Sequence, residues 1–102
     1  MKVVLCHFGN PWFDDVAELI YKHPMVYADI SGLTTGGGAY AEKFAGWLAG
    51  RISSAIYFAG GAEKVIFGTD YPVTDYPDAM DLVKRLDVSD ADRERILHRN
   101  AE

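Results

Sequence analysis

Short apolar runs alternate along the chain with longer stretches in which apolar residues recur every three or four positions. The short runs are residues 3–6, 26–30 and 65–67. Unbroken Val, Ile, Leu and Phe, clearest in the first and third runs, is typical of strands buried in a parallel sheet. Gly, Pro or Ser follows each run, so the pattern predicts three short strands.

The longer stretches predict amphipathic helices. We expect them around Val16 and Ile20, at residues 40–58, at residues 79–86, and from Ser89 onward. Pro24 should end the first helix, Gly60 should cap the second, and Ser89 is a candidate N-cap of the last. Strands that alternate with helices indicate the α/β class, with a parallel sheet and right-handed crossovers.

Three strands make an incomplete sheet. A parallel sheet is normally covered on both faces and does not leave two bare edges. With 102 residues, the chain has room for one domain. We therefore expect residues 1–102 to be a single segment cut from a larger α/β fold.

Charge and composition narrow the classes of partner. Hydrophobic residues make up 49% and charged residues 25%, as in ordinary globular proteins. A net charge of -5 without a Lys/Arg cluster argues against a nucleic acid or an anionic membrane as partner. The one cysteine cannot form an internal disulfide, which favours a reducing compartment. We expect a cytoplasmic protein that acts on a small molecule.

Two apolar runs end in side chains that can carry chemistry. His7 follows the first run, and Asp70 follows the third after a glycine. The carboxyl ends of parallel strands meet at one edge of a sheet, where α/β folds place their active sites. The sequence therefore predicts that His7 and Asp70 lie at the same rim.

Strand alternation gives further expectations for this rim. His7 should turn inward, whereas Cys6 should point the other way and pack under a helix as a small hydrophobe. Gly68 shares a face with Asp70 and should leave room for a ligand or a metal. The alternative for Asp70 is that its carboxylate only caps the following loop through a neighbouring threonine.

Imidazole and carboxylate together are ligands for a divalent metal such as zinc or manganese. A catalytic zinc needs three protein ligands, and the sequence contains no HxH, HExxH or CxxC motif. His23 and His98 are the other histidines, and we expect structural or solvent roles for both. The residues thus predict two ligands of a metal site, His7 and Asp70.

Further side chains near the strand ends are candidates for contact with a substrate. They are Asn10, Trp12, Ser31 and Tyr71. Asp29 shares a strand face with Ser31, so both could support the site or bond locally within a turn. The Gly36-Gly37-Gly38 segment lacks the spacing of a phosphate-binding loop and is expected to form a loop over the site.

Three segments, HFGNP at 7–11, VYADISG at 26–32 and FGTDYP at 67–72, form a recognisable pattern in this order. With them, the chain resembles the carboxyl-terminal part of the amidohydrolase-related metal-dependent hydrolases. That family also contains the aminocarboxymuconate-semialdehyde decarboxylase type. The resemblance covers essentially all 102 residues, and Asn100-Ala101 is similar to a pair near the family's C-terminus.

The resemblance implies a (β/α)₈ barrel of which this chain holds about strands six to eight with their helices. Asp70 would match the last-strand aspartate that binds metal and helps to activate water or substrate. His7 would match the sixth-strand histidine that binds metal or acts as an acid or base beside it. The family's first-strand His-X-His and fifth-strand histidine have no counterpart in these residues.

Two functions remain open at this stage. The first is the C-terminal part of a metal-dependent enzyme, with zinc expected, that hydrolyses a C–N, ester or lactone bond or decarboxylates a small carboxylic acid. Asp70 would act as general base, and His7 would polarise the substrate or share the proton transfer. The second is a non-catalytic partial barrel that hides its sheet edges by forming a homo-oligomer or by docking on another chain.

Overall fold

The computed structural model describes residues 1–34 and 40–101, so the expected loop at Gly36-Gly37-Gly38 lies outside the described residues. Within them a parallel sheet runs in the order β1 (Val3–Leu5), β2 (Val26–Asp29) and β3 (Val65–Ile66). β2 is therefore the central strand, paired with β1 on one side and with β3 on the other.

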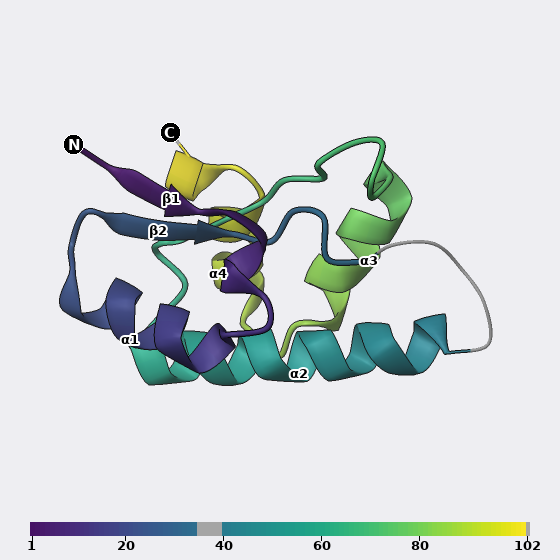
Figure 1. Ribbon diagram of the computed structural model, residues 1–102, viewed down its shortest axis with the longest axis horizontal. Coiled ribbons are helices and arrows are strands. Elements are labelled where there is room, and N and C mark those ends of the chain that lie inside the picture. The colour runs from purple at the N-terminus through teal and green to yellow at the C-terminus, as the bar shows by residue number, and fades with distance from the viewer. Residues whose placement is uncertain (35–39, 102) are drawn as a thin grey trace.

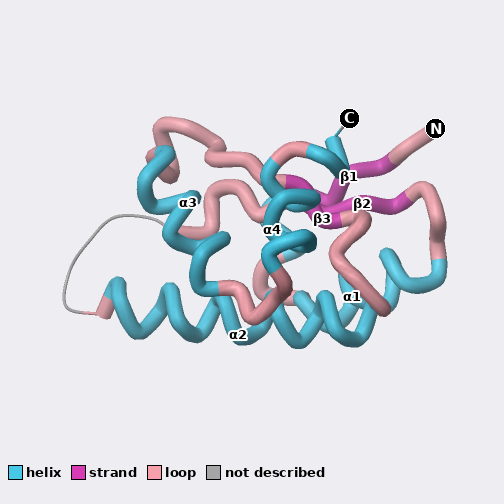
Figure 2. The backbone as a smooth tube through the Cα atoms, turned by 180° about the vertical axis from the view of Figure 1, so that it is seen from behind, coloured by secondary structure: helices cyan, strands magenta, loops and turns pink. Residues whose placement is uncertain are grey.

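The helices of the described residues are α1 (Phe13–Lys22), α2 (Ala41–Ala59), α3 (Tyr76–Arg85) and α4 (Asp90–Leu97), with 3₁₀ turns η1 (Cys6–Gly9) and η2 (Arg99–Ala101). The expected alternation of strands and helices is confirmed. In Figure 1, α1 lies between β2 and the long α2, and Figure 2 shows α4 beside β3. No helix among these has the length and apolar character needed to cross a lipid bilayer.

One hydrophobic core joins the sheet to the helices. Its largest buried side chains are Phe8, Phe13, Ile30, Leu48, Ile52, Val65, Leu82, Val83, Leu86 and Ile96. On α2, Leu48 and Ile52 face this core, one turn apart, as the periodicity of the sequence predicts. The core therefore lies on the helical side of the sheet.

Helix ends follow the sequence with one exception. The Ser89 hydroxyl accepts a hydrogen bond from the Asp92 amide at 3.1 Å, and Gly60 ends α2 with φ 89°, both as expected. The third helix was expected from residue 79 but begins at Tyr76. Asp75 caps it by accepting from the Asp78 amide at 2.9 Å, and proline is well tolerated in the first turn of a helix.

The side chains of Asn100 and Lys64 fix the short strand β3. Asn100 donates from its side-chain amide to the Ala62 carbonyl at 2.5 Å and to the Val65 carbonyl at 2.8 Å. Lys64 donates to the Ile20 carbonyl at 2.8 Å, which ties the start of β3 to the end of α1. The chain approaching Asp70 is therefore held from both sides.

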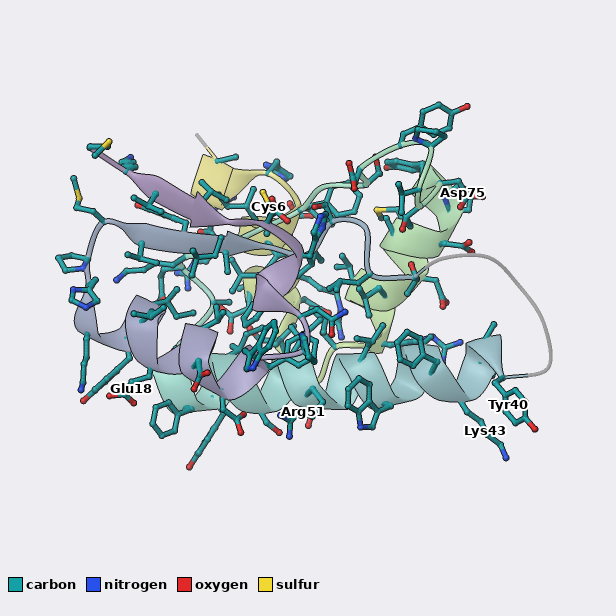
Figure 3. The ribbon with its side chains drawn as sticks, viewed as in Figure 1. Cys6, Glu18, Tyr40, Lys43, Arg51 and Asp75 are labelled. Atoms are coloured by element: carbon teal, nitrogen blue, oxygen red, sulfur yellow. The ribbon has the colours of Figure 1, made fainter. Side chains whose placement is uncertain are left out.

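The expectation that Cys6 packs under a helix is wrong. β1 ends at Leu5, and the chain turns at Cys6, whose side chain is exposed. Figure 3 shows Cys6 where β1 ends, on the side of the sheet away from α1 and α2. β1 is an edge strand that is only partly covered, with Val3 and Val4 42% and 45% exposed.

Candidate metal and active site

His7 lies in a turn rather than in a strand. Its φ of 58° and that of Phe8, 50°, place both residues in the left-handed region, which non-glycine residues rarely occupy. Phe8 is fully buried in the core and anchors this turn, and the His7 carbonyl accepts from the Asn10 amide at 2.9 Å. Strand alternation therefore does not extend to His7, and tertiary contacts decide its orientation.

The imidazole of His7 is oriented by the end of β2. Its Nδ1 lies 2.7 Å from the Ser31 carbonyl oxygen and 3.2 Å from the Ser31 hydroxyl. A carbonyl oxygen can only accept, so Nδ1 carries a hydrogen and donates it. In the neutral ring Nε2 then keeps its lone pair, the arrangement usual for a histidine that binds metal.

Asp70 also occupies the left-handed region, with φ 59°. Its carbonyl accepts from the Val73 amide at 2.8 Å in the turn that follows. The nearby threonines bond elsewhere, because Thr69 accepts from the Tyr71 amide and Thr74 donates to the Thr34 carbonyl. The carboxylate of Asp70 faces His7 instead of capping its own loop.

The two candidate ligands meet as the sequence predicts. His7 Nε2 lies 3.8 Å from Asp70 Oδ2, and both side chains are 46% exposed. This distance exceeds that of a hydrogen bond, and both atoms offer lone pairs. Two donors on one zinc at about 2.1 Å each lie at most about 4.2 Å apart, so the pair fits a divalent metal.

His7 and Asp70 alone do not make up a metal site. No group of three or more His, Cys, Asp or Glu side chains that could hold a metal exists in residues 1–34 and 40–101. A catalytic zinc site needs a third protein ligand. The described residues therefore bring together two candidate ligands, one fewer than a catalytic zinc site needs.

Gly32, not Gly68, makes room for the pair. A Cβ built on Gly32 would lie 2.8 Å from His7 Nδ1 and 2.9 Å from Asp70 Oδ2. A Cβ on Gly68 would instead lie 3.3 Å from the Ser31 Cβ, so the space expected for a ligand there is filled by Ser31. The role of Gly32 was not foreseen, because a glycine after a strand also reads as a simple breaker.

Asp29 and Ser31 form a hydrogen-bonded group beneath His7. One Asp29 oxygen, Oδ1, accepts from the His7 amide at 2.9 Å, from the Ser31 amide at 3.1 Å and from the Ser31 hydroxyl at 2.6 Å. The negative charge of Asp29 raises the pKa of the nearby Cys6 thiol, and slight desolvation and a hydrogen bond with Asp29 add to this effect. The thiolate that binds metals is thereby disfavoured.

The predicted substrate contacts separate into two groups. Ser31 is buried, 8% exposed, and its polar atoms are taken up by Asp29 and His7. Asn10 is exposed, as are Trp12 and Tyr71, at 65% and 78%. Tyr71 adjoins Asp70 in the chain, whereas Trp12 lines a hollow that neither His7 nor Asp70 lines. Their contact with substrate stays a prediction.

Comparison with known proteins gives two kinds of match. A family model described as amidohydrolase matches residues 1–102. Among solved structures, the chain is similar to a dihydroxybenzoic acid decarboxylase from Polaromonas sp. JS666 with bound manganese and 2-nitroresorcinol, at 20% identity and TM-score 0.65. It is also similar to a 2,6-dihydroxybenzoate decarboxylase from Rhizobium, at 19% identity and TM-score 0.66.

The coverage of these matches limits which properties of the two solved structures can be assigned to this chain. Each covers 98% of this chain, but 32% of the Polaromonas protein and 33% of the Rhizobium protein. No curated protein matches the chain. The small parallel sheet with its helices thus has the fold of one part of a barrel enzyme about three times as long.

Proposed function

The chain belongs to the amidohydrolase family, and on this premise we propose that it is one part of a metal-dependent enzyme that decarboxylates or hydrolyses a small carboxylic acid or its derivative. The observation that carries the proposal is the His7–Asp70 pair, with Nε2 and Oδ2 facing each other 3.8 Å apart. His7 lies in the turn after β1 and Asp70 in the turn after β3, the two neighbours of the central strand, at the rim where α/β enzymes place their chemistry.

His7 Nε2 and Asp70 Oδ2 would hold a divalent metal together with ligands outside this chain. The Polaromonas protein contains manganese, whereas the sequence alone suggested zinc, and the two donor types suit both metals. Such a metal supplies Lewis acidity that polarises a carbonyl or carboxyl oxygen. We place the three strands at about positions six to eight of the barrel, as the resemblance implies.

Asp70 is the group of this chain that we assign to proton transfer. Its carboxylate is half-exposed, and its Oδ2 faces His7 Nε2 at 3.8 Å, beyond hydrogen-bond distance. It can therefore take up or return a proton at the reacting atom. His7 cannot move a proton through Nδ1, because that hydrogen is donated to the Ser31 carbonyl.

This proposal is tested by substituting Asp70 in the full-length protein as the source cells make it. The protein is loaded with Mn²⁺ or Zn²⁺, and release of CO₂ from 2,6-dihydroxybenzoate and hydrolysis of a simple lactone are followed. We expect Asp70→Asn to lower turnover by about 10²–10⁴-fold, the usual contribution of a general base. Asp87→Asn, a matched change at an exposed carboxylate, should leave turnover unchanged.

Unchanged turnover in Asp70→Asn would reject the assignment. The 102-residue chain expressed alone should be inactive on both substrates, since it supplies two metal ligands only. Turnover by that chain with one bound metal per molecule would contradict the proposal that other segments complete the site.

A second candidate function rests on the exposed valines of the edge strand β1. An uncovered parallel edge favours pairing with another strand, so a non-catalytic module would form a homo-oligomer or dock on a partner chain. Sedimentation of the 102-residue chain separates the two functions. A dimer favours the second function if neither the 102-residue chain nor the protein from its source cells shows metal-dependent turnover. A monomer that unfolds cooperatively argues against it.

A further inference from the structure

Asp29 stands at the centre of the candidate site without facing the reacting atoms. It is the last residue of β2, and β2 is the strand between β1 and β3. Its Oδ1 accepts from the backbone amide of His7, which is 22 positions away in the sequence. The same oxygen accepts from the amide and the hydroxyl of Ser31. One carboxylate oxygen therefore ties the turn after β1 to the end of the central strand.

These bonds lead to the imidazole of His7 by two routes. The first route is the backbone, since a left-handed conformation at a non-glycine residue is unfavourable unless the surroundings hold it. The second route is Ser31, whose carbonyl receives the Nδ1 hydrogen at 2.7 Å. Asp29 thus holds both the residue that carries the ring and the group that orients the ring.

We propose that Asp29 is a positioning residue that fixes His7 in the Nδ1–H tautomer and directs the Nε2 lone pair toward Asp70. The significance of this role for turnover rests on the proposed function. The tautomer itself follows from the hydrogen bonds within this chain and does not depend on a metal or a substrate. Asp29 differs from the candidate ligands because it acts through His7 and not on the reacting atoms.

The tautomer can be read directly by ¹⁵N NMR of the 102-residue chain. At a pH at which the imidazoles are neutral, the ¹⁵N shifts of Nδ1 and Nε2 distinguish the two tautomers. His7→Gln identifies the His7 signals among those of the three histidines. In the unsubstituted chain we expect His7 to be almost entirely Nδ1–H, whereas the histidine side chain in an unstructured peptide prefers hydrogen on Nε2.

Two substitutions at Asp29 separate positioning from general stability. Asp29→Ala removes the acceptor, and we expect His7 to shift to a mixture in which the Nε2–H tautomer predominates. Asp29→Asn keeps an acceptor oxygen and should retain the Nδ1–H tautomer. Asp15→Ala, at an exposed carboxylate of α1, is the control and should leave the His7 signals unchanged.

The proposal is overturned if the folded Asp29→Ala variant still shows His7 almost entirely as the Nδ1–H tautomer. Should that variant fail to fold, hydrogen exchange of the unsubstituted chain decides instead. The amides of His7 and Ser31, bonded to Asp29, should then exchange at least about tenfold more slowly than in an unstructured chain. Exchange of both amides at the unstructured rate overturns the proposal as well.

The failure of this proposal and the failure of the proposed function give different results. If Asp70→Asn loses turnover but the His7 tautomer does not change in Asp29→Ala, only the positioning role of Asp29 is rejected. If the His7 tautomer changes in Asp29→Ala but the protein has no metal-dependent turnover, the proposed enzymatic function is rejected and the positioning role of Asp29 stands.

Discussion

The turns that carry His7 and Asp70 share a backbone conformation but differ in how they are held. Both residues are left-handed, with φ 58° and 59°, and each follows an outer strand of the sheet. The His7 turn is fixed by the side chain of Asp29, at the end of β2, and by the carbonyl of Ser31 just after it, both far away in the sequence. The Asp70 turn is held by backbone bonds, from the Val73 amide to the Asp70 carbonyl at 2.8 Å and from the Gly32 amide to the neighbouring Thr69 carbonyl at 3.1 Å.

As a result, the His7 ring has a fixed orientation, whereas the Asp70 carboxylate can adjust its position. The His7 ring has a fixed donor at Nδ1 and a defined direction for Nε2. The Asp70 carboxylate is half-exposed, and its Oδ2 lies 3.8 Å from His7 Nε2. A site that pairs a fixed ligand with an adjustable carboxylate can bind a metal and still change the protonation or coordination of one member.

Gly32→Ala should have the largest effect on the fold, because it disturbs both turns together. A methyl group there would meet His7 and Asp70 below 3.0 Å, and the φ of 62° strains any residue with a Cβ. We expect a loss of about 2–3 kcal/mol in the free energy of unfolding, measured by urea denaturation. Gly50→Ala is the control in α2, where a Cβ meets nothing within 4 Å, and should gain up to about 1 kcal/mol.

An unchanged stability in Gly32→Ala would mean that the two turns tolerate more space between them than the structure shows. The His7 tautomer offers a second measurement on the same variant. Displacement of the ring by the methyl group should weaken the bond from Nδ1 to the Ser31 carbonyl and introduce the Nε2–H form.

Asn100→Ala should loosen the Asp70 side selectively. The substitution removes donors to the Ala62 and Val65 carbonyls at the start of β3 and costs about 1–3 kcal/mol of stability. Faster hydrogen exchange should appear in β3, while the His7 tautomer should stay as it is. Arg99→Ala, an exposed change in the same 3₁₀ turn, should alter neither. Equal loosening of both turns would remove the distinction between them.

The smallest effect concerns the reactivity of Cys6. Asp29 first, and Asp70 to a lesser degree, raise the pKa of this thiol because negative charge disfavours the thiolate. Below that pKa less thiolate is present, so iodoacetamide should alkylate the folded chain at pH 8 more slowly than the unfolded chain. Asp29→Asn should speed the reaction more than Asp70→Asn does, and the differences should vanish at high pH.

The chain contains a single cysteine, so mass spectrometry reads this reaction without ambiguity. Equal rates in the folded and unfolded chains would show that neither carboxylate lies near the thiol. That result would count against the position of Asp29 at the end of β2.

Local patterns sufficed for the elements of this fold. The 3.6-residue spacing on α1 and α2, the serine cap at Ser89 and the glycine at Gly60 all act over a few residues, so the sequence displays them. The start of α3 was placed three residues too late, at residue 79, although Asp75 accepting from the Asp78 amide is a usual capping pattern and proline is well tolerated in the first turn.

The sequence predicted which residues meet at the rim of the sheet, but not the backbone conformations that bring them together. His7 and Asp70 were expected together because parallel strands end at one edge, and the structure brings them together. Their left-handed conformations were not foreseeable, since contacts distant in sequence hold His7 in that region. The error at Cys6 has the same cause, because the alternation rule fails where β1 ends one residue earlier than expected.

The order of the strands also sets which charge the rim can accept. His7 and Asp70 start from strands on either side of β2, about 10 Å apart across two strand spacings. They converge above Gly32, whose amide hydrogen is already donated to the Thr69 carbonyl at 3.1 Å. In the described part of the chain, an atom held between them meets lone pairs on both sides and no free amide below. The sheet thereby builds a position that attracts cations and repels anions.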